Sequence, residues 1–598
     1  MFKFKLIYVA LAAAMTSTYV YADPTTYTLP SDTKVIDIEA PNAAGVSHNL
    51  YRDFSVDDKG AILNNSSVDY QHETLGTIAK NNNLTAGSAS VILNEVISKT
   101  PSKLQGFIEV GGQKADVIIA NPYGITCSGC SFINTSNVVL TTGKVNLADT
   151  GAISSYAVTG GTVNVGTGGL NAPNSYVSLL ADVINLNDMV TAQHAQLSAG
   201  NFLFDNATGA ITPAGKEAGI YGKLSTTYSI DISSLGGVKA NSITMVGNNL
   251  GFGVRNKGAI VANAGLSMTS NGSLVNEGTI NGNGVVSQLA SLGEFNNSGK
   301  ISTNYFGTLI SYGNFNNSGT ITNGMQMAIA AAGNMQNTGY IKGAQSLEIT
   351  TNGDLTTKYL SEIASRDKLA ITTLGSVNNG GGIYAKNIDA KFGGSAFNVT
   401  GYMTGSEKLS IKATKNDKSA SGKISNSGTL TGGDVELITD GDLYMAKYSL
   451  LEVNKSLNTR SFNFDNAGVI TGIKGQYGDL YFDNYSTTNT GQIIGQSVKF
   501  NTWYDMLNEG MLEGRDTLEI DTQGNGNFTN RSSIYAGTLK ISAKKVFNGG
   551  YRCGFMNLAT CGVGNINADK LVLKSTHNYA SEMGGVQKIK NIEINTVK

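Results

Sequence analysis

N-K-G-A-I at residues 256–260, N-E-G-T-I at 276–280, N-S-G-K-I at 297–301, N-S-G-T-I at 317–321 and N-T-G-Y-I at 337–341 are copies of one pattern. Their isoleucines at 260, 280, 301, 321 and 341 are spaced by 20, 21, 20 and 20 residues. The pattern returns less regularly at 426–430, 466–470, 489–493 and 508–512. A nearly constant period of this kind decides the fold class.

Each repeat offers two or three short alternating segments separated by Asn or Gly turns, as in L-S-M-T-S-N-G-S-L-V-N-E-G at 266–278. A period near 20 is too short for a propeller blade, no helical stripe is present, and the L-x-x-L-x-L spacing of leucine-rich repeats is absent. We therefore predict an all-β fold, a parallel β-helix (solenoid) with roughly 20-residue coils.

Stacking of such coils predicts two ladders of identical side chains. Ile260, Ile280, Ile301, Ile321 and Ile341 should stack in the interior. The asparagines that open the repeats should stack at a corner, where their amides bond to one another and to the turn backbone; these are Asn256, Asn276, Asn297, Asn317 and Asn337. Because Asn tolerates a left-handed φ, we expect that conformation at these corners.

The chain divides into three parts. Residues 1–22 are predicted to be a secretory signal peptide, since basic Lys3 and Lys5 precede an apolar run and a small-residue cleavage pattern that ends at Ala22. Residues 23–260 are strand-rich without a clean repeat, and we interpret them as an irregular, capped first section of the solenoid. Residues 261–598 form the repeating stalk.

The charge balance argues against several classes of partner. Charged residues make up 15% of the chain and almost cancel, with 43 Lys and Arg against 44 Asp and Glu. A nearly neutral chain has no electrostatic case for binding nucleic acid or an anionic membrane, so we predict no nucleic-acid partner.

Four cysteines in an exported chain make two disulfides plausible. Cys127 with Cys130 and Cys553 with Cys561 is the simplest pairing, although other pairings remain formally possible. A redox-active dithiol needs a helix N-terminus or a nearby cation, which the strand-and-turn sequence does not predict. No second Cys or His pair stands at zinc-ligand spacing, so we predict neither a metal site nor a cofactor.

A tight elbow follows the apolar run at 117–119. It consists of Asn121, Pro122, Tyr123, Gly124 and Ile125. Asn and Pro start turns and Gly supplies positive φ. From the residues alone, this segment is a structural turn between two strands, because it holds no acid, base or activated nucleophile.

Six segments resemble the N-terminal secretion domain of filamentous haemagglutinin and haemolysin-type exoproteins of two-partner secretion. They are G-V-S-H-N-L-Y-R-D-F-S-V-D-D-K-G-A-I-L-N-N at 45–65, V-I-L-N-E-V at 91–96, L-Q-G-F-I-E-V-G-G-Q-K-A-D-V-I-I-A-N-P-Y-G-I at 104–125, C-S-G-C-S-F-I-N-T at 127–135, V-V-L-T-T-G at 138–143 and V-R-N-K-G-A-I at 254–260. The repeats that follow resemble haemagglutinin repeats.

The resemblance implies a right-handed β-helix that an outer-membrane β-barrel transporter with periplasmic docking modules threads out of the cell. It also implies that the elbow and an upstream Asn-Pro motif matter for secretion. Here Tyr123 departs from the family's Asn-Pro-Asn-Gly-Ile, and Thr100 stands before Pro101 where Asn is usual. Asn94, Glu95 and Val96 match a further family motif, and Cys127 with Cys130 matches a pair of haemolysin-like members.

The expected function is that of a secreted or surface-bound adhesin of the haemagglutinin type, which contacts a receptor on a host cell or a neighbouring bacterium. Three alternatives remain open: a pore-forming cytolysin activated by its partner, a truncated stalk of a contact-dependent growth inhibitor, and a β-helical polysaccharide-degrading enzyme. Enzymes of the last class need grouped carboxylates. The acids between 434 and 442 alternate with apolar residues as on a solvated strand, so we expect no enzyme.

Overall fold

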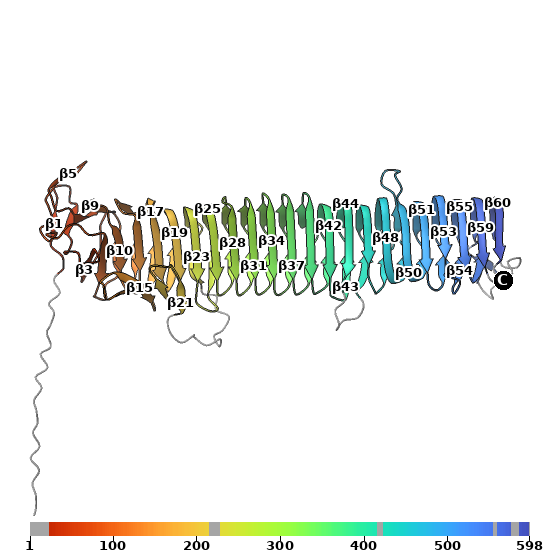
Figure 1. Cartoon of the computed structure of the whole chain (residues 1–598), viewed down its shortest axis with the longest axis horizontal. Helices are drawn as coiled ribbons and strands as arrows, with labels where there is room; N and C mark the ends of the chain where they lie inside the picture. Colours follow the sequence, from red (N-terminus) through yellow and green to blue (C-terminus); the bar gives the residue numbers. More distant parts are fainter. Residues whose placement is uncertain are drawn as a thin grey trace, which may run out of the picture.

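In the computed structural model the chain is a rod of stacked coils, with β1 (Thr26–Thr28) and β60 (Val586–Thr596) at opposite ends (Figure 1). The structure describes residues 23–213, 228–414, 422–549, 551–553, 559–561, 563–575 and 585–596. The predicted signal peptide lies outside the described residues. Those residues form strands and turns and no helix, so none of their segments is a helix long and apolar enough to cross a membrane. The prediction of an all-β solenoid is confirmed.

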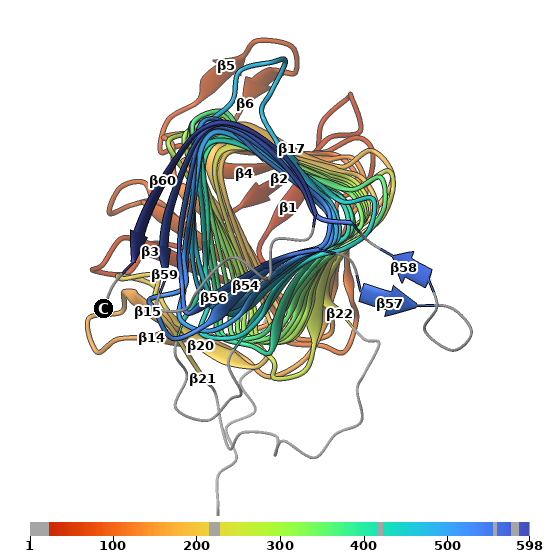
Figure 2. The ribbon, with the colours of Figure 1, turned by 90° about the vertical axis from the view of Figure 1, so that its right-hand side faces the viewer.

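Each coil of the regular section holds three short strands. One coil contains β26 (Leu274–Asn276), β27 (Thr279–Gly282) and β28 (Val286–Ser291), and the next contains β29 (Phe295–Asn297), β30 (Lys300–Thr303) and β31 (Phe306–Ser311). Each strand pairs in parallel with its equivalent one coil away, β26 with β29, β27 with β30 and β28 with β31. Viewed along the rod, the coils superpose on one outline (Figure 2).

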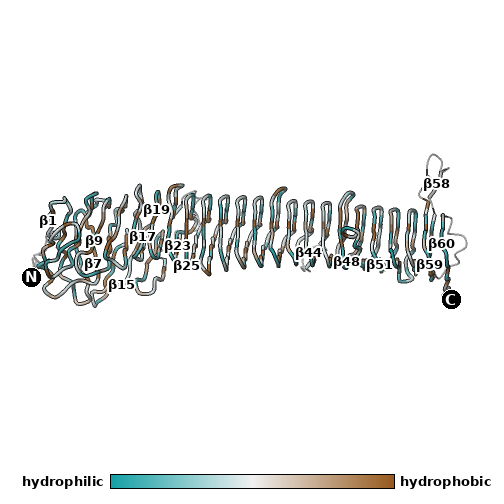
Figure 3. Tube along the Cα trace, turned by 90° about the horizontal axis from the view of Figure 1, so that it is seen from above, coloured by the Kyte–Doolittle hydropathy of each residue, from teal (hydrophilic) through white to brown (hydrophobic). Residues whose placement is uncertain are grey.

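The predicted isoleucine ladder is confirmed. Ile260, Ile280, Ile301, Ile321 and Ile341 are partners in register on consecutive coils, and all five are buried. Apolar and polar residues alternate along the coils (Figure 3). Burying one such side chain contributes roughly 1.5–3 kcal/mol, so the interior is a column of similar, additive contributions.

The asparagine ladder is also confirmed, but its backbone differs from our expectation. The amide Nδ2 of Asn276 donates to Asn297 Oδ1 (2.7 Å), and Asn297 donates to Asn317 in the same way (2.7 Å). Among the described residues, Asn134 is the one asparagine with positive φ, so the left-handed expectation for the ladder is wrong. Asparagine suits this corner because its side-chain amide both donates and accepts. The buried amides therefore hydrogen-bond to one another along the ladder.

The glycine of each repeat serves close stacking. A Cβ on Gly319 would overlap the carbonyl oxygen of Gly299, and one on Gly339 would overlap that of Gly319. Neither residue has positive φ. The Asn-x-Gly pattern thus pairs a hydrogen-bonding side chain with a position that has no room for one.

The N-terminal section is capped and irregular, as predicted. Strand β1 pairs antiparallel with β2 (Lys34–Asp37), which in turn pairs in parallel with β4 (Ala61–Asn65). The hairpin of β5 (Tyr70–His72) and β6 (Gly76–Ile78) projects from the rod (Figures 1 and 2). An antiparallel closing strand hides the open edge that a first coil otherwise exposes.

A four-stranded antiparallel sheet lies against one flank of this section. Its strands are β14 (Lys144–Leu147), β15 (Ile153–Val158), β20 (Phe202–Asp205) and β21 (Ile211–Pro213). Tyr156 and Phe202 of this side sheet pack in one buried cluster with Leu93, Ile118 and Leu180 of the solenoid. The sheet therefore buries solenoid strands on their outer face, which explains the unbroken apolar run at 117–119.

The later coils carry longer strands and one projecting ribbon. Among the long strands are β48 (Leu450–Asn466), β50 (Asp479–Asn489), β51 (Gln492–Thr502) and β53 (Met511–Asp521). Cys553 and Cys561 end the antiparallel pair β57 (Tyr551–Cys553) and β58 (Ala559–Cys561), which projects from the rod (Figure 2). The predicted bond between these two cysteines concerns side chains outside the described part of the structure.

Candidate functional site

The elbow at 121–124 joins two strands that are paired on both edges. Strand β10 (Asp116–Ala120) pairs with β7 (Val91–Val96) and with β13 (Asn137–Thr141). Strand β11 (Ile125–Cys127) pairs with β8 (Ser102–Leu104) and with β16 (Thr162–Val165). Each strand stacks on its equivalent in the preceding coil, so the elbow lies directly over the segment 97–101 that joins β7 to β8.

Asn121 fastens these two corners together. Its Nδ2 donates to the Thr100 carbonyl (2.9 Å) and to Ser102 Oγ (3.0 Å), and its Oδ1 accepts from the Tyr123 N–H (2.9 Å). The side chain is fully buried, and both amide hydrogens and the amide oxygen have partners. Losing one such buried network costs roughly 1–3 kcal/mol, so Asn121 holds the shape of the elbow and is not available for contact with another molecule.

The backbone closes the elbow as a tight turn. The Gly124 N–H donates to the Asn121 carbonyl (3.1 Å), and the Ser102 N–H donates to the Gly124 carbonyl (3.0 Å). Gly124 has φ 113°, where an L side chain is strained. Gly161 stacks on the opposite side, where a Cβ would come within 2.7 Å of the Pro122 carbonyl oxygen.

The outer surface of the two corners is formed by the remaining motif residues. Thr100, Pro101, Pro122 and Tyr123 are exposed, Tyr123 by 49%. We call these four residues the elbow ridge. The structure thus brings the predicted upstream Pro101 motif and the predicted elbow together, and it divides the motif into buried residues that set the shape and exposed ones that display it.

The third predicted motif, Asn94, Glu95 and Val96, forms the end of β7, directly before the segment 97–101. Asn94 is buried, with its Oδ1 accepting from the Tyr51 hydroxyl (3.0 Å) and its Nδ2 donating to the Ile118 carbonyl (3.3 Å). Burial raises the pKa of Tyr51 far above its ordinary value, so this phenol remains a neutral donor. Asn94 and Val96 are therefore framework residues of β7.

Glu95 is the partly exposed member of that motif. Its Oε2 lies 2.8 Å from His48 Nε2, and the two residues lie on β7 and on the adjacent strand β3 (Val46–Tyr51). A second pair of the same kind joins His72 Nε2 to Glu109 Oε2 at 3.0 Å, beside a cavity of about 720 Å³ under the β5–β6 hairpin. Burial, and then the nearby Glu109 charge, raises the pKa of Tyr70 in this cavity to about 12.

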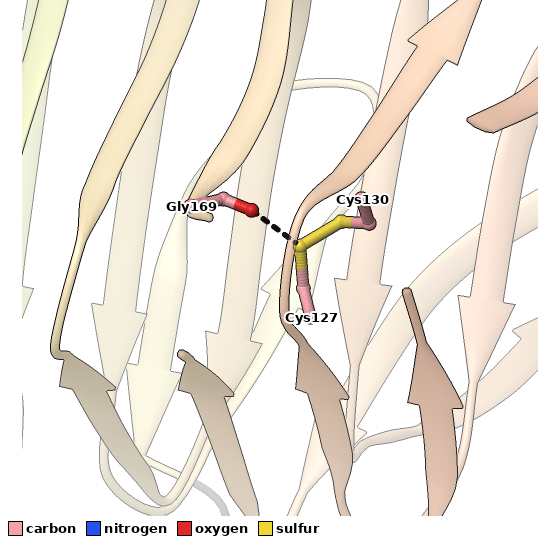
Figure 4. The surroundings of a disulfide bond; sticks show 3 residues. All are labelled: Cys127, Cys130 and Gly169. Carbon is pink, nitrogen blue, oxygen red and sulfur yellow. Dashed lines mark hydrogen bonds between the residues drawn. A yellow bond between two sulfur atoms is a disulfide. The ribbon is translucent and has the colours of Figure 1, made fainter. Parts of the chain in front are cut away.

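Cys127 and Cys130 are joined by a disulfide at the next corner of the same coil (Figure 4). Both residues are fully buried, and Gly129 between them has φ 83°. Cys127 Sγ lies 3.2 Å from the Gly169 carbonyl oxygen, a close approach without a donated proton because a disulfide sulfur carries none. This bond fixes a corner two residues after the elbow, and its sulfur atoms are shielded from exchange with external thiols.

Sequence reasoning missed the packing of the side sheet on β10 and the stacking of the following coil on the elbow. The side sheet covers Ile118, three residues before Asn121, and Gly161 stacks on Pro122 from the following coil. The Gly160-Gly161 pair was the one available sequence signal for that stacking. Within the described part of the chain, no group of three or more His, Cys, Asp or Glu residues is arranged to hold a metal ion.

Comparisons with known proteins match the N-terminal part of the chain. Residues 23–281 match the family model of the TPS secretion domain, a match that runs past residue 260 into the first repeats. Over 259 residues the chain is 39% identical to "Toxin CdiA" of Yersinia pestis, covering 43% of this chain and 8% of that protein. Over 276 residues it is 36% identical to filamentous hemagglutinin of Bordetella pertussis, covering 43% of this chain and 8% of that protein.

One solved structure is similar over about half of the chain. The crystal structure of the filamentous hemagglutinin secretion domain has a TM-score of 0.43 and 30% identity, and the match covers 52% of this chain and 98% of that one. The chain spans less than a tenth of the length of the two curated relatives, whose match covers 8% of each.

Proposed function

The chain belongs to the two-partner secretion exoproteins, and on that premise we propose that its partner transporter in the outer membrane recognises the elbow ridge as a secretion address. The placement of Pro101 and Pro122 on the two corners that Asn121 joins carries this proposal. Prolines keep one φ and present no N–H, so the ridge is a rigid, mostly apolar feature on a surface of polar turns.

The pairing of the strands indicates when the transporter acts. Both edges of β11 are occupied by β8 and β16, so the folded coil offers no free edge there. Docking by strand addition therefore uses an edge that later coils have still to cover, on a chain in which the two corners joined by Asn121 have already formed. We place recognition in the periplasm, on a partly folded chain whose signal peptide, residues 1–22, has directed it across the inner membrane.

Coil formation then drives the chain outward. Each coil that closes outside the cell templates the next through its ladder contacts, which in the regular coils are one Ile contact and one Asn–Asn hydrogen bond, as between Asn297 and Asn317. Because these contacts form without a distant partner, every exported coil opposes backsliding by its own free energy.

On the cell surface we propose that the stalk acts as an adhesin that contacts a receptor by binding and not by catalysis. The acidic residues that a degrading enzyme would need are engaged in pairs between coils. Glu436 bonds to Lys412 (2.9 Å), and Asp434 accepts from Ser456 Oγ (2.7 Å). A second candidate is a contact-inhibition stalk, favoured by the match to "Toxin CdiA".

Measuring the secretion of two matched asparagine variants tests whether the transporter recognises the elbow ridge. Co-expressed with its transporter, Asn121→Ala should be exported at least about tenfold less than the parent chain, since its loss releases both corners. Asn317→Ala removes a buried amide of the same kind from the stalk and should be exported nearly as well as the parent chain. Equal loss of export by both variants would show that general stability, and not the elbow, limits secretion.

A further inference from the structure

One corner of the stalk has a glycine in coil after coil. In each coil this glycine stands two residues before a buried position of the ladder that begins with Phe295, Phe315 and Met335. The glycines are Gly293, Gly313, Gly333, Gly353 and Gly375. A Cβ on Gly313 would come within 2.9 Å of the Gly293 backbone, so the corner has no room for a side chain.

Three consecutive coils break this rule with aromatic residues. The equivalent positions two residues before Phe464, Thr487 and Met506 are Phe462, Tyr485 and Tyr504. Gly441 on the coil before and Gly526 on the coil after restore the glycine. Strands β48 and β50 run through the corner without a break at Phe462 and Tyr485, whereas Tyr504 lies in a bend between β51 and β52 (Met506–Asn508). All three side chains are exposed to solvent.

The three rings stack along the rod. Phe462 and Tyr485 have ring centroids 4.8 Å apart, and Tyr485 and Tyr504 have centroids 5.7 Å apart, with an interplanar angle of 4° in both pairs. Phe462, Tyr485 and Tyr504 are 51%, 44% and 50% exposed, and the neighbouring Trp503 is 57% exposed. An ordered row of half-exposed aromatics on a polar surface marks a contact site.

A cavity of about 250 Å³ runs beside this row. Its lining includes the aromatic residues Phe462, Tyr485 and Trp503 and the charged residues Asp440, Arg460 and Asp483. Asn501 Nδ2 donates to Asp483 Oδ1 (2.8 Å), which fixes that carboxylate in place. A lining that combines apolar rings with planar hydrogen-bonding groups suits a ligand ring that is apolar on its C–H side and carries hydroxyls on its rim.

The charge of the corner selects among such ligands. Arg460 is the one cation among the residues that line the cavity, against Asp440 and Asp483. Asp505 follows Tyr504 directly, and Asp442 follows Gly441 on the coil before the aromatic row. A net negative site repels sulfated or sialylated sugars. We propose that the corner formed by Phe462, Tyr485, Trp503 and Tyr504 binds a neutral glycan; this rests on the proposed adhesive function and names its ligand class.

The single tryptophan of the chain makes the test direct, because Trp503 is the one Trp in 598 residues and lies in the site. The purified full chain is titrated with maltohexaose, cellohexaose and mannohexaose, and separately with dextran sulfate. We expect a saturable change of Trp fluorescence with at least one neutral hexaose and none with dextran sulfate. No response to any neutral hexaose, or saturation by dextran sulfate, would overturn the proposal.

Variants of Tyr485 complete the test. Tyr485→Ala should weaken binding at least about tenfold, whereas Tyr485→Phe keeps the ring and should bind like the parent chain. Tyr312→Ala removes an exposed ring elsewhere on the stalk and should change nothing. Unchanged affinity in Tyr485→Ala overturns the proposal.

Cell adhesion is measured in parallel. A chain that binds hexaose but does not adhere to cells contradicts the adhesin and leaves the glycan site. A chain that adheres while its Trp signal is silent contradicts the glycan site and leaves the adhesin.

Discussion

The N-terminal section and the regular stalk share one coil geometry but fasten their coils in opposite ways. In the regular coils between residues 256 and 341, the same contacts recur, one interior Ile and one corner Asn, as at Asn297 and Asn317. In the N-terminal section each corner has its own fastening: Asn121 bonds to Thr100, and Cys127 bonds to Cys130.

This difference has a consequence for folding. Coils that share these contacts can shift by one whole coil and keep most of them, so the regular repeats do not fix their own register. The N-terminal corners fit in one way alone. The irregular section therefore sets the register that the repeats propagate, and evolution can place a recognition motif there without repeating it down the rod.

The largest expected loss of stability comes from a substitution that destabilises the N-terminal section and leaves the stalk intact. Tyr156→Ala removes a fully buried ring of the side sheet and should cost about 3–5 kcal/mol locally. Hydrogen exchange followed by mass spectrometry should show lost protection in β10 and β13 and unchanged protection in β26 to β31. Uniform loss along the rod would mean that the two regions unfold as one unit.

The second effect breaks the stalk instead. Asn317→Ala leaves the Asn297 amide without its acceptor and should cost roughly 1–3 kcal/mol. Protection should fall in the coils on either side of residue 317 and remain intact around the elbow. Lost protection at β10 would contradict the independence of the two regions.

The features that these two experiments probe could not be predicted equally well from the sequence. The Ile and Asn ladders follow from the sequence because the same residue returns at a fixed period, and stacking turns that period into contact. The fastening of Asn121 to Thr100 does not follow, because no repeat relates them and the length of the intervening coil is irregular. The packing of the side sheet on the solenoid was missed because its strands leave the solenoid at turns that resemble all the others.

Removal of the disulfide is expected to have an intermediate effect. Cys127→Ser with Cys130→Ser frees a very short loop and should cost roughly 2 kcal/mol. The midpoint of thermal unfolding of the N-terminal section should fall in this variant. The control variant, Cys553→Ser with Cys561→Ser, changes the projecting ribbon alone and should leave that midpoint unchanged. An unchanged midpoint in the first variant would mean that the buried corner is held by packing.

The smallest effect concerns two aspartates of the N-terminal section. Burial raises the pKa of half-buried Asp37, against the hydrogen bond from Asn64. Its charge therefore opposes folding at neutral pH and stops doing so as the pH falls through the raised pKa, so Asp37→Asn should stabilise the chain at neutral pH and have no effect in acid. Solvent screening keeps the gain below about 1 kcal/mol.

The charge of Asp205 is expected to change stability in the opposite direction. Hydrogen bonds from Thr208 lower the pKa of the Asp205 carboxyl, so its stabilising contribution is present above the ordinary pKa of an aspartate and is lost on acidification. Asp205→Asn should therefore destabilise the side sheet at neutral pH. Thermal melts of both variants across the acid range should separate in opposite directions, and a shift of the same sign in both would contradict these assignments.

The most direct test of the account asks whether the transporter touches the elbow ridge during export. A photo-crosslinking p-benzoyl-phenylalanine is placed at Tyr123, which is 49% exposed on the ridge, and at Tyr312, which is 63% exposed on the stalk. Illumination during secretion should yield a stable adduct with the periplasmic part of the transporter from position 123 and little from position 312. Normal secretion with no adduct at 123, or equal adducts at both positions, would contradict recognition of the elbow.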